Sequence, residues 1–184
     1  MTQDSSRSYN CVLELLLEKC LIRPWRAGDE ESLVRHANNR NVWRNLRDIF
    51  PSPYTMADAR AWIAATSAES PQTNYAIEVE GEAAGGIGLA LQRDVEWRSA
   101  EIGFWLGEEL WGRGIMSEAV RAFTECAFLR FDLCRVYARV FEWNAASGRV
   151  LERAGYVFEG RLRKSATKDG RTIDQLMYAA TIND

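Results

Sequence analysis

A change of hydrophobic period near residue 74 constrains the fold of this chain more than any other feature. From there, three segments with a period of two follow one another, at residues 75–79, 84–91 and 100–106, with polar turns between them. This period predicts strands, and the short turns predict an antiparallel meander. Residues 113–130 then have apolar side chains at helical spacing, and residues 135–141 return to a strand pattern.

This order predicts one strand–helix–strand crossover within a sheet that is otherwise antiparallel. A crossover with a helix joins parallel strands, whereas the short turns of a meander join antiparallel ones. Residues 145–154 are expected to form a further helix, and Asp169 and Gly170 form a hairpin turn between two final strands. The predicted fold class is therefore α/β, with a mixed, mostly antiparallel central sheet flanked by helices.

The first third of the chain is predicted to be mainly helical. Residues 11–25 are expected to form one strand that a proline closes. Asp29 is placed to cap a helix, and a short helical piece is expected at residues 42–46. Thr55 with Asp58 three residues later is typical of a helix start.

Length and composition predict one domain. The chain has 184 residues, of which 47% are hydrophobic and 27% charged, and this suits a single globular core. We expect residues 11–184 to form that domain, after a polar N-terminal segment at residues 1–10.

Several classes of function are excluded by what the sequence lacks. The formal net charge of -3 gives no overall basic field that would attract nucleic acid. Apolar stretches fall far short of the roughly 20 residues that cross a bilayer, and no secretory signal is found, so a cytoplasmic location is expected. The four cysteines have unrelated spacings and His36 is the only histidine, which predicts neither a metal site nor a disulfide framework. We expect His36 to be a packing or surface residue.

A glycine turn between a strand and the long helix predicts an anion site. The first N–H groups of a helix lack partners within it, and Gly112 and Gly114 would let a phosphate approach them, with Arg113 and Ser117 as further donors. A P-loop would need a lysine after the glycines, which is missing. A Rossmann fingerprint would need a parallel sheet, which the meander does not fit. The third alternative is the pyrophosphate of coenzyme A.

Residues 111–119 resemble the acyl-CoA pyrophosphate motif of the GNAT superfamily of N-acetyltransferases, most closely its RimJ/RimL branch. Residues 21–25, 100–106 and 144–156 resemble further segments of that branch, in the same order. The resemblance runs from about residue 21 to about residue 180 and implies the GNAT fold.

The resemblance implies that acetyl-CoA donates its acetyl group to a primary amine by direct attack in a ternary complex, without a metal. The RimJ/RimL branch acetylates protein N-termini, so the expected acceptor is a protein N-terminal amine, such as that of a ribosomal protein. Two alternatives stay open: a small-molecule amine such as an amino acid, polyamine or antibiotic, and an inactive CoA-binding regulatory module. The expected oligomeric state is a monomer or a homodimer.

The resemblance also implies roles for individual residues. Glu101 is the first candidate for the general base. The alternative role for Glu101 is a structural ion pair, and the alternative route for the proton is a water relay. Ser147 is the candidate proton donor to the leaving thiolate, beside a helix-capping role. A main-chain N–H near Phe104 or Trp105 is expected to bind the oxyanion. The cofactor-binding residues are expected to be Phe104, Trp105, Leu106, Trp111, Gly112, Arg113, Gly114, Ile115, Met116, Ser117, Asn144 and Ser147, and the substrate-binding residues Trp43, Arg44, Tyr54 and Asp174.

The chain departs from the family pattern at two positions. Glu109 stands where the pyrophosphate motif commonly has Gln or Arg, and its carboxylate does not supply the donor that those residues offer to a phosphate. Leu151 stands where many superfamily members carry a tyrosine that acts as the general acid, and the RimJ/RimL branch often lacks this tyrosine too. A basic cluster near the hairpin is expected to be a solvated face, with an acidic or ribosomal partner as the alternative; its members are Arg161, Arg163, Lys164, Lys168 and Arg171.

Overall fold

The computed structural model describes residues 13–182, which form one eight-stranded sheet in the order β1-β2-β3-β4-β5-β6-β8-β7. The strands are β1 (Leu15–Leu16), β2 (Leu21–Arg23), β3 (Asn74–Val79), β4 (Glu82–Leu91), β5 (Ser99–Leu106), β6 (Arg135–Phe141), β7 (Val157–Lys168) and β8 (Arg171–Thr181). The helices are α1 (Glu30–Ala37), α2 (Arg40–Trp43), α3 (Met56–Ser67), α4 (Ile115–Phe131) and α5 (Ala145–Arg153), with short 3-10 turns at Asp94–Glu96 and Glu108–Leu110.

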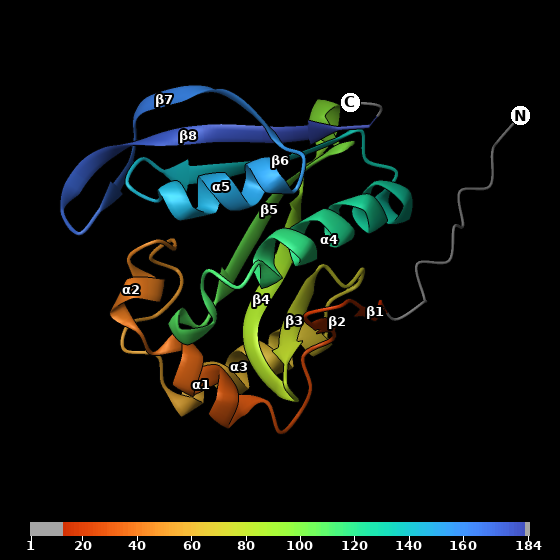
Figure 1. Ribbon diagram of the computed structural model, residues 1–184, viewed down its shortest axis with the longest axis vertical. Coiled ribbons are helices and arrows are strands. Elements are labelled where there is room, and N and C mark those ends of the chain that lie inside the picture. The colour runs from red at the N-terminus through yellow and green to blue at the C-terminus, as the bar shows by residue number, and fades with distance from the viewer. Residues whose placement is uncertain (1–12, 183–184) are drawn as a thin grey trace, which may run out of the picture.

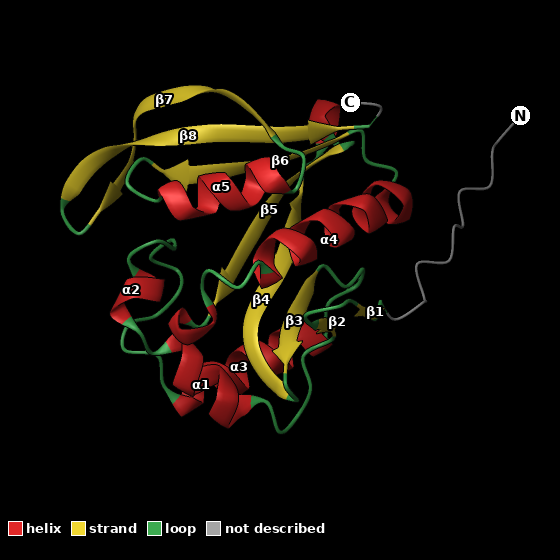
Figure 2. Ribbon diagram, in the orientation of Figure 1, coloured by secondary structure: helices red, strands yellow, loops and turns green. Residues whose placement is uncertain are grey.

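Helices cover both faces of this sheet (Figure 2). Along β3, Tyr75 and Ile77 belong to one hydrophobic cluster together with Phe123 of α4. The residue between them, Ala76, belongs to a second cluster with Leu33 of α1. Because successive strand residues point to opposite faces, the two clusters lie on the two sides of the sheet. Figure 1 shows α4 and α5 side by side in front of it.

The predicted fold class is confirmed, including the single crossover. All strand pairs in the described part of the chain are antiparallel except β5 and β6, which are parallel and joined through α4. The β5–β6 register holds only from Ser99↔Arg135 to Glu101↔Tyr137. Beyond it both strands continue, β5 to Leu106 and β6 to Phe141, without pairing with each other. The sheet therefore opens between these two strands.

Several local predictions agree with the structure. Asp169 and Gly170 both have positive φ angles, +50° and +72°, in the turn between β7 and β8. Thr55 and Asp58 form the expected capping box at the start of α3.

No helix in residues 13–182 is long and apolar enough to span a membrane.

The prediction of one strand over residues 11–25 is wrong for the described part of that range. Two short strands, β1 and β2, pair there through a turn that the Leu17 N–H closes on the Cys20 carbonyl at 2.9 Å. Residues 1–10, expected as a polar segment, lie outside the described residues. The short helix also begins earlier than expected, since Asn39 caps α2 by accepting the N–H groups of Asn41 and Val42.

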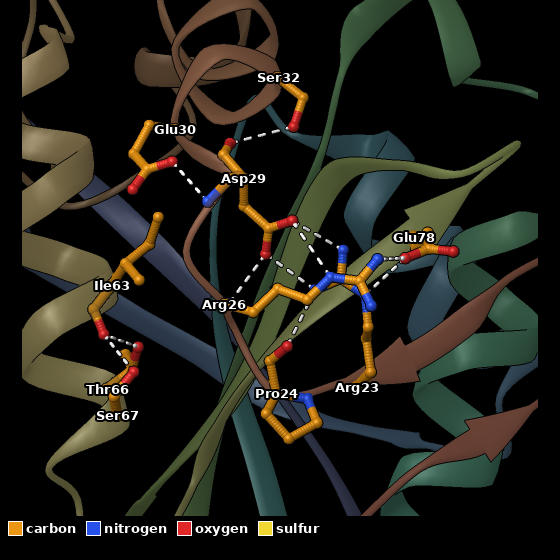
Figure 3. A network of polar contacts seen from close by, with 11 residues as sticks. Arg23, Pro24, Arg26, Asp29, Glu30, Ser32, Ile63, Thr66, Ser67 and Glu78 are labelled. Carbon is orange, nitrogen blue, oxygen red and sulfur yellow. Dashed lines mark hydrogen bonds and ion pairs between the residues drawn. The ribbon is translucent and has the colours of Figure 1, made fainter.

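Asp29 precedes α1 as predicted, but its carboxylate does not cap the helix. Instead it accepts two hydrogen bonds, both 2.8 Å, from Arg23, whose side chain is only 2% exposed (Figure 3). The Arg23 Nε also donates to Glu78 of β3. A buried guanidinium needs charged or polar partners. Because the Asp29 carboxylate pairs with Arg23, it does not bond to the N–H groups at the start of the helix.

Candidate active site

The glycine turn has the geometry that an anion site needs. Gly112 and Gly114 have φ angles of +78° and +80°, in the left-handed region that favours glycine. No side chain caps α4 at Gly114, so the first N–H groups of the helix remain available to bind an anion. A Cβ on Gly112 would have no atom within 4 Å, whereas a Cβ on Gly114 would lie 3.1 Å from Nζ of Lys19. The turn is therefore open at Gly112 and has a lysine ammonium beside it at Gly114.

The structure gives Glu109 a role away from this turn. Its carboxylate lies 2.7 Å from Nδ1 of His36, a residue of α1 that is 5% exposed. The same ring fills the space beside Gly107, where a Cβ would come within 2.5 Å of Nδ1. His36 is thus a packing residue, one of the two roles expected for it, and Glu109 connects the segment before the turn to α1.

A cavity of about 660 Å³ extends from the glycine turn toward α5; we call it the glycine-turn cavity. It brings together every predicted cofactor-binding residue except Arg113, whose side chain is exposed and donates to the Glu109 carbonyl. Predicted residues in its lining are Phe104, Trp105, Leu106, Trp111, Gly112, Gly114, Ile115, Met116, Ser117, Asn144 and Ser147.

Three arginines also line the glycine-turn cavity. Arg44 was expected on the acceptor side, whereas Arg149 and Arg153 were not predicted at all. The last two lie four residues apart on α5, so they share one face of that helix. Their spacing after Asn144 could have predicted that both face the cavity. They add positive charge to this cavity, although the chain has a net charge of -3.

A second cavity, of about 650 Å³, lies beyond the opening between β5 and β6; we call it the aromatic cavity. Its walls include Phe50, Tyr54, Trp62, Tyr75 and Trp105. Tyr54 was a predicted substrate residue, and burial raises the pKa of its hydroxyl to about 12. This phenol therefore stays protonated near neutral pH.

Six residues line both cavities and mark the place where they meet: Asn45, Leu46, Phe104, Trp105, Asn144 and Ser147. Main-chain hydrogen bonds join Gln92 to Ser99 and Gly107 to Ala84, so the odd-numbered residues of β5 bond to β4. Main-chain groups alternate along a strand, and those of Phe104 therefore point toward β6, where β6 no longer pairs. A backbone donor and acceptor thus face the opening between the two strands.

Ser147 lies at this meeting point with a defined hydrogen-bond state. Asn144 caps α5 by accepting the Ser147 N–H at 3.2 Å, so the capping role belongs to Asn144. The Asn144 amide nitrogen donates to the Ser147 hydroxyl oxygen at 2.9 Å. Because that oxygen is an acceptor here, the hydroxyl hydrogen is left to be donated elsewhere.

Glu101 is held by two arginines. Its side chain accepts bonds from Arg139 Nε at 3.1 Å and Nη2 at 2.6 Å, and a further bond from Arg47 Nη2. Burial alone would raise the pKa of this carboxyl, but the bonds to Arg139 and Arg47 outweigh it and lower the pKa. The geometry matches the structural ion pair that stood beside the catalytic role, and a carboxylate so held is a weak base.

Trp43 and Asp174, both expected to bind substrate, line neither cavity. The Trp43 ring lies 3.4 Å from the ammonium of Lys168, and its Nε1 donates to the Phe50 carbonyl. Asp174 pairs with Arg161 at 2.9 Å. Trp43 therefore contacts Lys168 through a cation–π interaction, and Asp174 pairs with Arg161; both partners belong to the β7–β8 hairpin.

Lys168 was expected on a solvated face but is 2% exposed. Its ammonium also lies 2.6 Å from Asp48, so the hairpin holds the segment between α2 and α3, which walls both cavities. Figure 1 shows α2 next to the turn that joins β7 and β8.

Arg47 and Arg139 are site residues that the sequence reasoning missed. Arg139 alternates with the buried residues Val136, Ala138 and Val140 of β6 and lies on the more exposed face of the strand, so the strand pattern gave it no distinctive signal. Arg47 lies in a loop and carried none. No group of three potential metal ligands occurs among residues 13–182.

Comparisons with known proteins agree with this geometry. Residues 19–157 match the family model described as the acetyltransferase (GNAT) domain. An uncharacterized N-acetyltransferase, p20 of Bacillus licheniformis, is 29% identical over 171 residues, covering 90% of this chain and 94% of its own.

Two solved structures share the fold. RimJ of Mycobacterium smegmatis, in complex with CoA-disulfide, is 25% identical with a TM-score of 0.77, covering 88% of this chain and 81% of its own. RimL, a ribosomal L7/L12 alpha-N-protein acetyltransferase in complex with coenzyme A, is 22% identical with a TM-score of 0.80, covering 92% and 97%. With three quarters of its length inside the family model, the chain belongs to the GNAT family of N-acetyltransferases.

Proposed function

We propose that this protein transfers the acetyl group of acetyl-CoA to a primary amine, with both substrates bound at once. The observation that carries this proposal is the meeting of two cavities at Phe104, Asn144 and Ser147. One cavity starts at a glycine turn suited to phosphates, and the other has space for an acceptor. Holding two reactants in a well-oriented geometry can lower the activation barrier by up to about 7–11 kcal/mol.

Acetyl-CoA is assigned to the glycine-turn cavity. The N–H groups from Gly112 to Ser117 would bind the pyrophosphate, with Arg149 and Arg153 as charged partners. The pantetheine arm would follow the opening between β5 and β6 and donate to the main-chain carbonyl of Phe104. RimL and RimJ, with coenzyme A or its disulfide in their structures, support this assignment.

The chemistry then needs a donor to the oxyanion, a proton donor to the thiolate and an acceptor for the proton of the amine. The amine nitrogen attacks the thioester carbonyl, a C–N bond forms, and the C–S bond breaks when the tetrahedral intermediate collapses. The Phe104 N–H is our candidate donor to the oxyanion, and the Ser147 hydroxyl is our candidate donor of a proton to the thiolate. Leu151 is fully buried and lines neither cavity, so it takes no part.

The proton of the attacking amine must also leave. The arginine bonds that lower the pKa of Glu101 make it a weak acceptor, so we favour transfer through water over direct transfer to this carboxylate. Glu101 then holds Arg47 and Arg139 in the wall of the aromatic cavity.

The acceptor we propose is a protein N-terminal amine, in a protein that works in the cytoplasm. RimL, described as acting on ribosomal L7/L12, and the similarity to RimJ support this class. The apolar and aromatic lining of the aromatic cavity favours the second candidate, a small-molecule amine, because it can pack against a compact apolar body.

Thiol release from acetyl-CoA with a panel of amines tests this function. The panel contains N-terminal peptides, free amino acids and polyamines, and mass spectrometry locates the acetyl group on each product. Acetylation of an N-terminal amine supports the proposal. Coenzyme A binding without turnover of any amine would instead favour a regulatory CoA-binding module.

A further inference from the structure

We propose that the acceptor carries a carboxylate close to its amine, and that Arg47 and Arg139 in the aromatic cavity bind this carboxylate. The proposal rests on the proposed function, because it names the chemistry of the amine that occupies the acceptor side. Neither arginine was singled out by the sequence, and the glycine-turn cavity does not include them.

The charges in the wall of the aromatic cavity do not balance. Its charged lining residues are Arg47, Glu101 and Arg139, which sum to one net positive charge. Glu101 is the only carboxylate in this lining, and it is 8% exposed. A second carboxylate, supplied by the acceptor, would compensate the remaining charge.

Free donors remain on both guanidinium groups. Arg139 uses Nε and Nη2 for Glu101, which leaves its Nη1. Arg47 uses only Nη2, which leaves Nε and Nη1, and its side chain is 56% exposed. A guanidinium fork binds carboxylate oxygens through parallel N–H bonds, so these groups are suited to a carboxylate.

The same positive charge selects against other acceptors. A polyamine would bring further ammonium groups toward Arg47 and Arg139, and like charges repel. The attacking amine must be neutral, and the nearby guanidinium groups disfavour its ammonium form. A carboxylate on the acceptor favours the ammonium form of its own amine, but pairing with the guanidinium groups offsets this effect and provides binding energy.

The rest of the wall fits an apolar body. Leu46, Ile49, Phe50, Tyr54 and Trp105 line the cavity around the arginines. Apolar and aromatic walls with a few polar groups are typical of sites that surround a small ligand or one side chain. The recognised chemistry is thus a primary amine and a carboxylate on an apolar body.

Two sources supply this chemistry: a free amino acid carries its own carboxylate, and a protein N-terminus carries one when an acidic residue follows the first residue. Matched pairs separate them. Phenylalanine is compared with phenylalaninamide, and a C-terminally amidated phenylalanyl-aspartyl peptide with its phenylalanyl-asparaginyl counterpart.

Calorimetric titration of these four probes into the CoA-saturated protein measures recognition without turnover. We expect the carboxylate member of at least one pair to bind about tenfold more tightly, the size of one charge-assisted hydrogen bond. Preference in the first pair identifies a free amino acid, and preference in the second identifies a protein N-terminus. Equal affinities in both pairs overturn the proposal.

Arg47→Gln tests the residue. The affinity ratio within the preferred pair should fall from about ten to near one, and differences in amine pKa cancel in this comparison because the probes are the same. Arg98→Gln is the matched control, since Arg98 pairs with Asp132 and lines neither cavity; its ratio should match the wild type. A ratio that survives Arg47→Gln removes Arg47 from the proposal.

The two proposals fail differently. If carboxylate probes bind with the expected preference but no amine is acetylated, the proposed function fails and the recognition stands. If amines are acetylated without any carboxylate preference, the function stands and the recognition is wrong.

Discussion

Replacing Gly112 by alanine tests the phosphate role of the glycine turn with two separable effects. Gly112 has a φ of +78°, where an L residue costs roughly 1–2 kcal/mol. Nothing lies within 4 Å of the added Cβ, so no clash adds to this cost. For a chain of this length, we expect the melting temperature to fall by about 2–8 °C.

The effect on coenzyme A should be separate and larger. Gly112 lines the cavity, so the new methyl group stands where a phosphate would approach the main chain. The loss of one charge-assisted hydrogen bond of about 1.5–3 kcal/mol corresponds to roughly 10- to 100-fold weaker binding. Calorimetric titration with coenzyme A, at a temperature where both proteins are folded, measures it.

Gly81→Ala is the matched control. Gly81 has a φ of +85° and an equally open Cβ position, but it lies in the β3–β4 turn and lines neither cavity. It should lose the same stability and keep wild-type affinity for coenzyme A. Wild-type affinity in Gly112→Ala, or an equal loss of affinity in Gly81→Ala, would refute the assignment of the phosphate site.

Three further predictions concern charged groups. Glu101→Gln should keep the shape of the pH–rate profile at about pH 6–9, because a carboxyl with a lowered pKa has no limb there; a lost limb would identify Glu101 as the base. Since the folded pKa lies below the unfolded one, the stability that Glu101 contributes is present above about pH 4.5 and lost at lower pH, so acid unfolding of the variant should show a weaker pH dependence. Lys168→Met should raise KM for both substrates and cost about 1–3 kcal/mol in denaturant unfolding, because its cation–π contact with Trp43 and its ion pair are lost; unchanged KM values would contradict its positioning role. Arg23→Met should cost about 3–5 kcal/mol, since buried Asp29 would lose both bonds from the guanidinium and keep only the Arg26 N–H and a 3.9 Å contact with the exposed Arg26 side chain, and a loss below about 1 kcal/mol would contradict that account.

Local patterns predicted the order of the elements well. The period of two in β3 to β5, the helical spacing of α4 and the Asp169-Gly170 turn are all properties of short segments. The prediction of one strand at residues 11–25 was wrong because a turn at residues 17–20 interrupts it. That turn rests on α4, where Glu118 accepts the N–H groups of Glu18 and Lys19.

The glycine-turn cavity was largely anticipated, and the acceptor side much less so. Most cofactor residues follow one another along the chain, so a single motif could carry them. Trp43 and Asp174 were predicted to bind substrate from their residue types and positions in the chain. In the structure Trp43 contacts Lys168 and Asp174 pairs with Arg161, outside both cavities. Nothing in the local sequence shows which charged side chains will pair across the fold.

The sequence by itself determined the crossover, the glycine turn at Gly112 and Gly114, and the family, because each depends on neighbouring residues and on their spacing. Only the tertiary structure decided where β5 and β6 separate and which side chains fill the space beyond. Arg47 meets Glu101 across 54 positions of sequence, and Lys168 meets Asp48 across 120. Ion pairs between such distant positions exist only after the sheet has formed, and they decide which charges remain available to an acceptor.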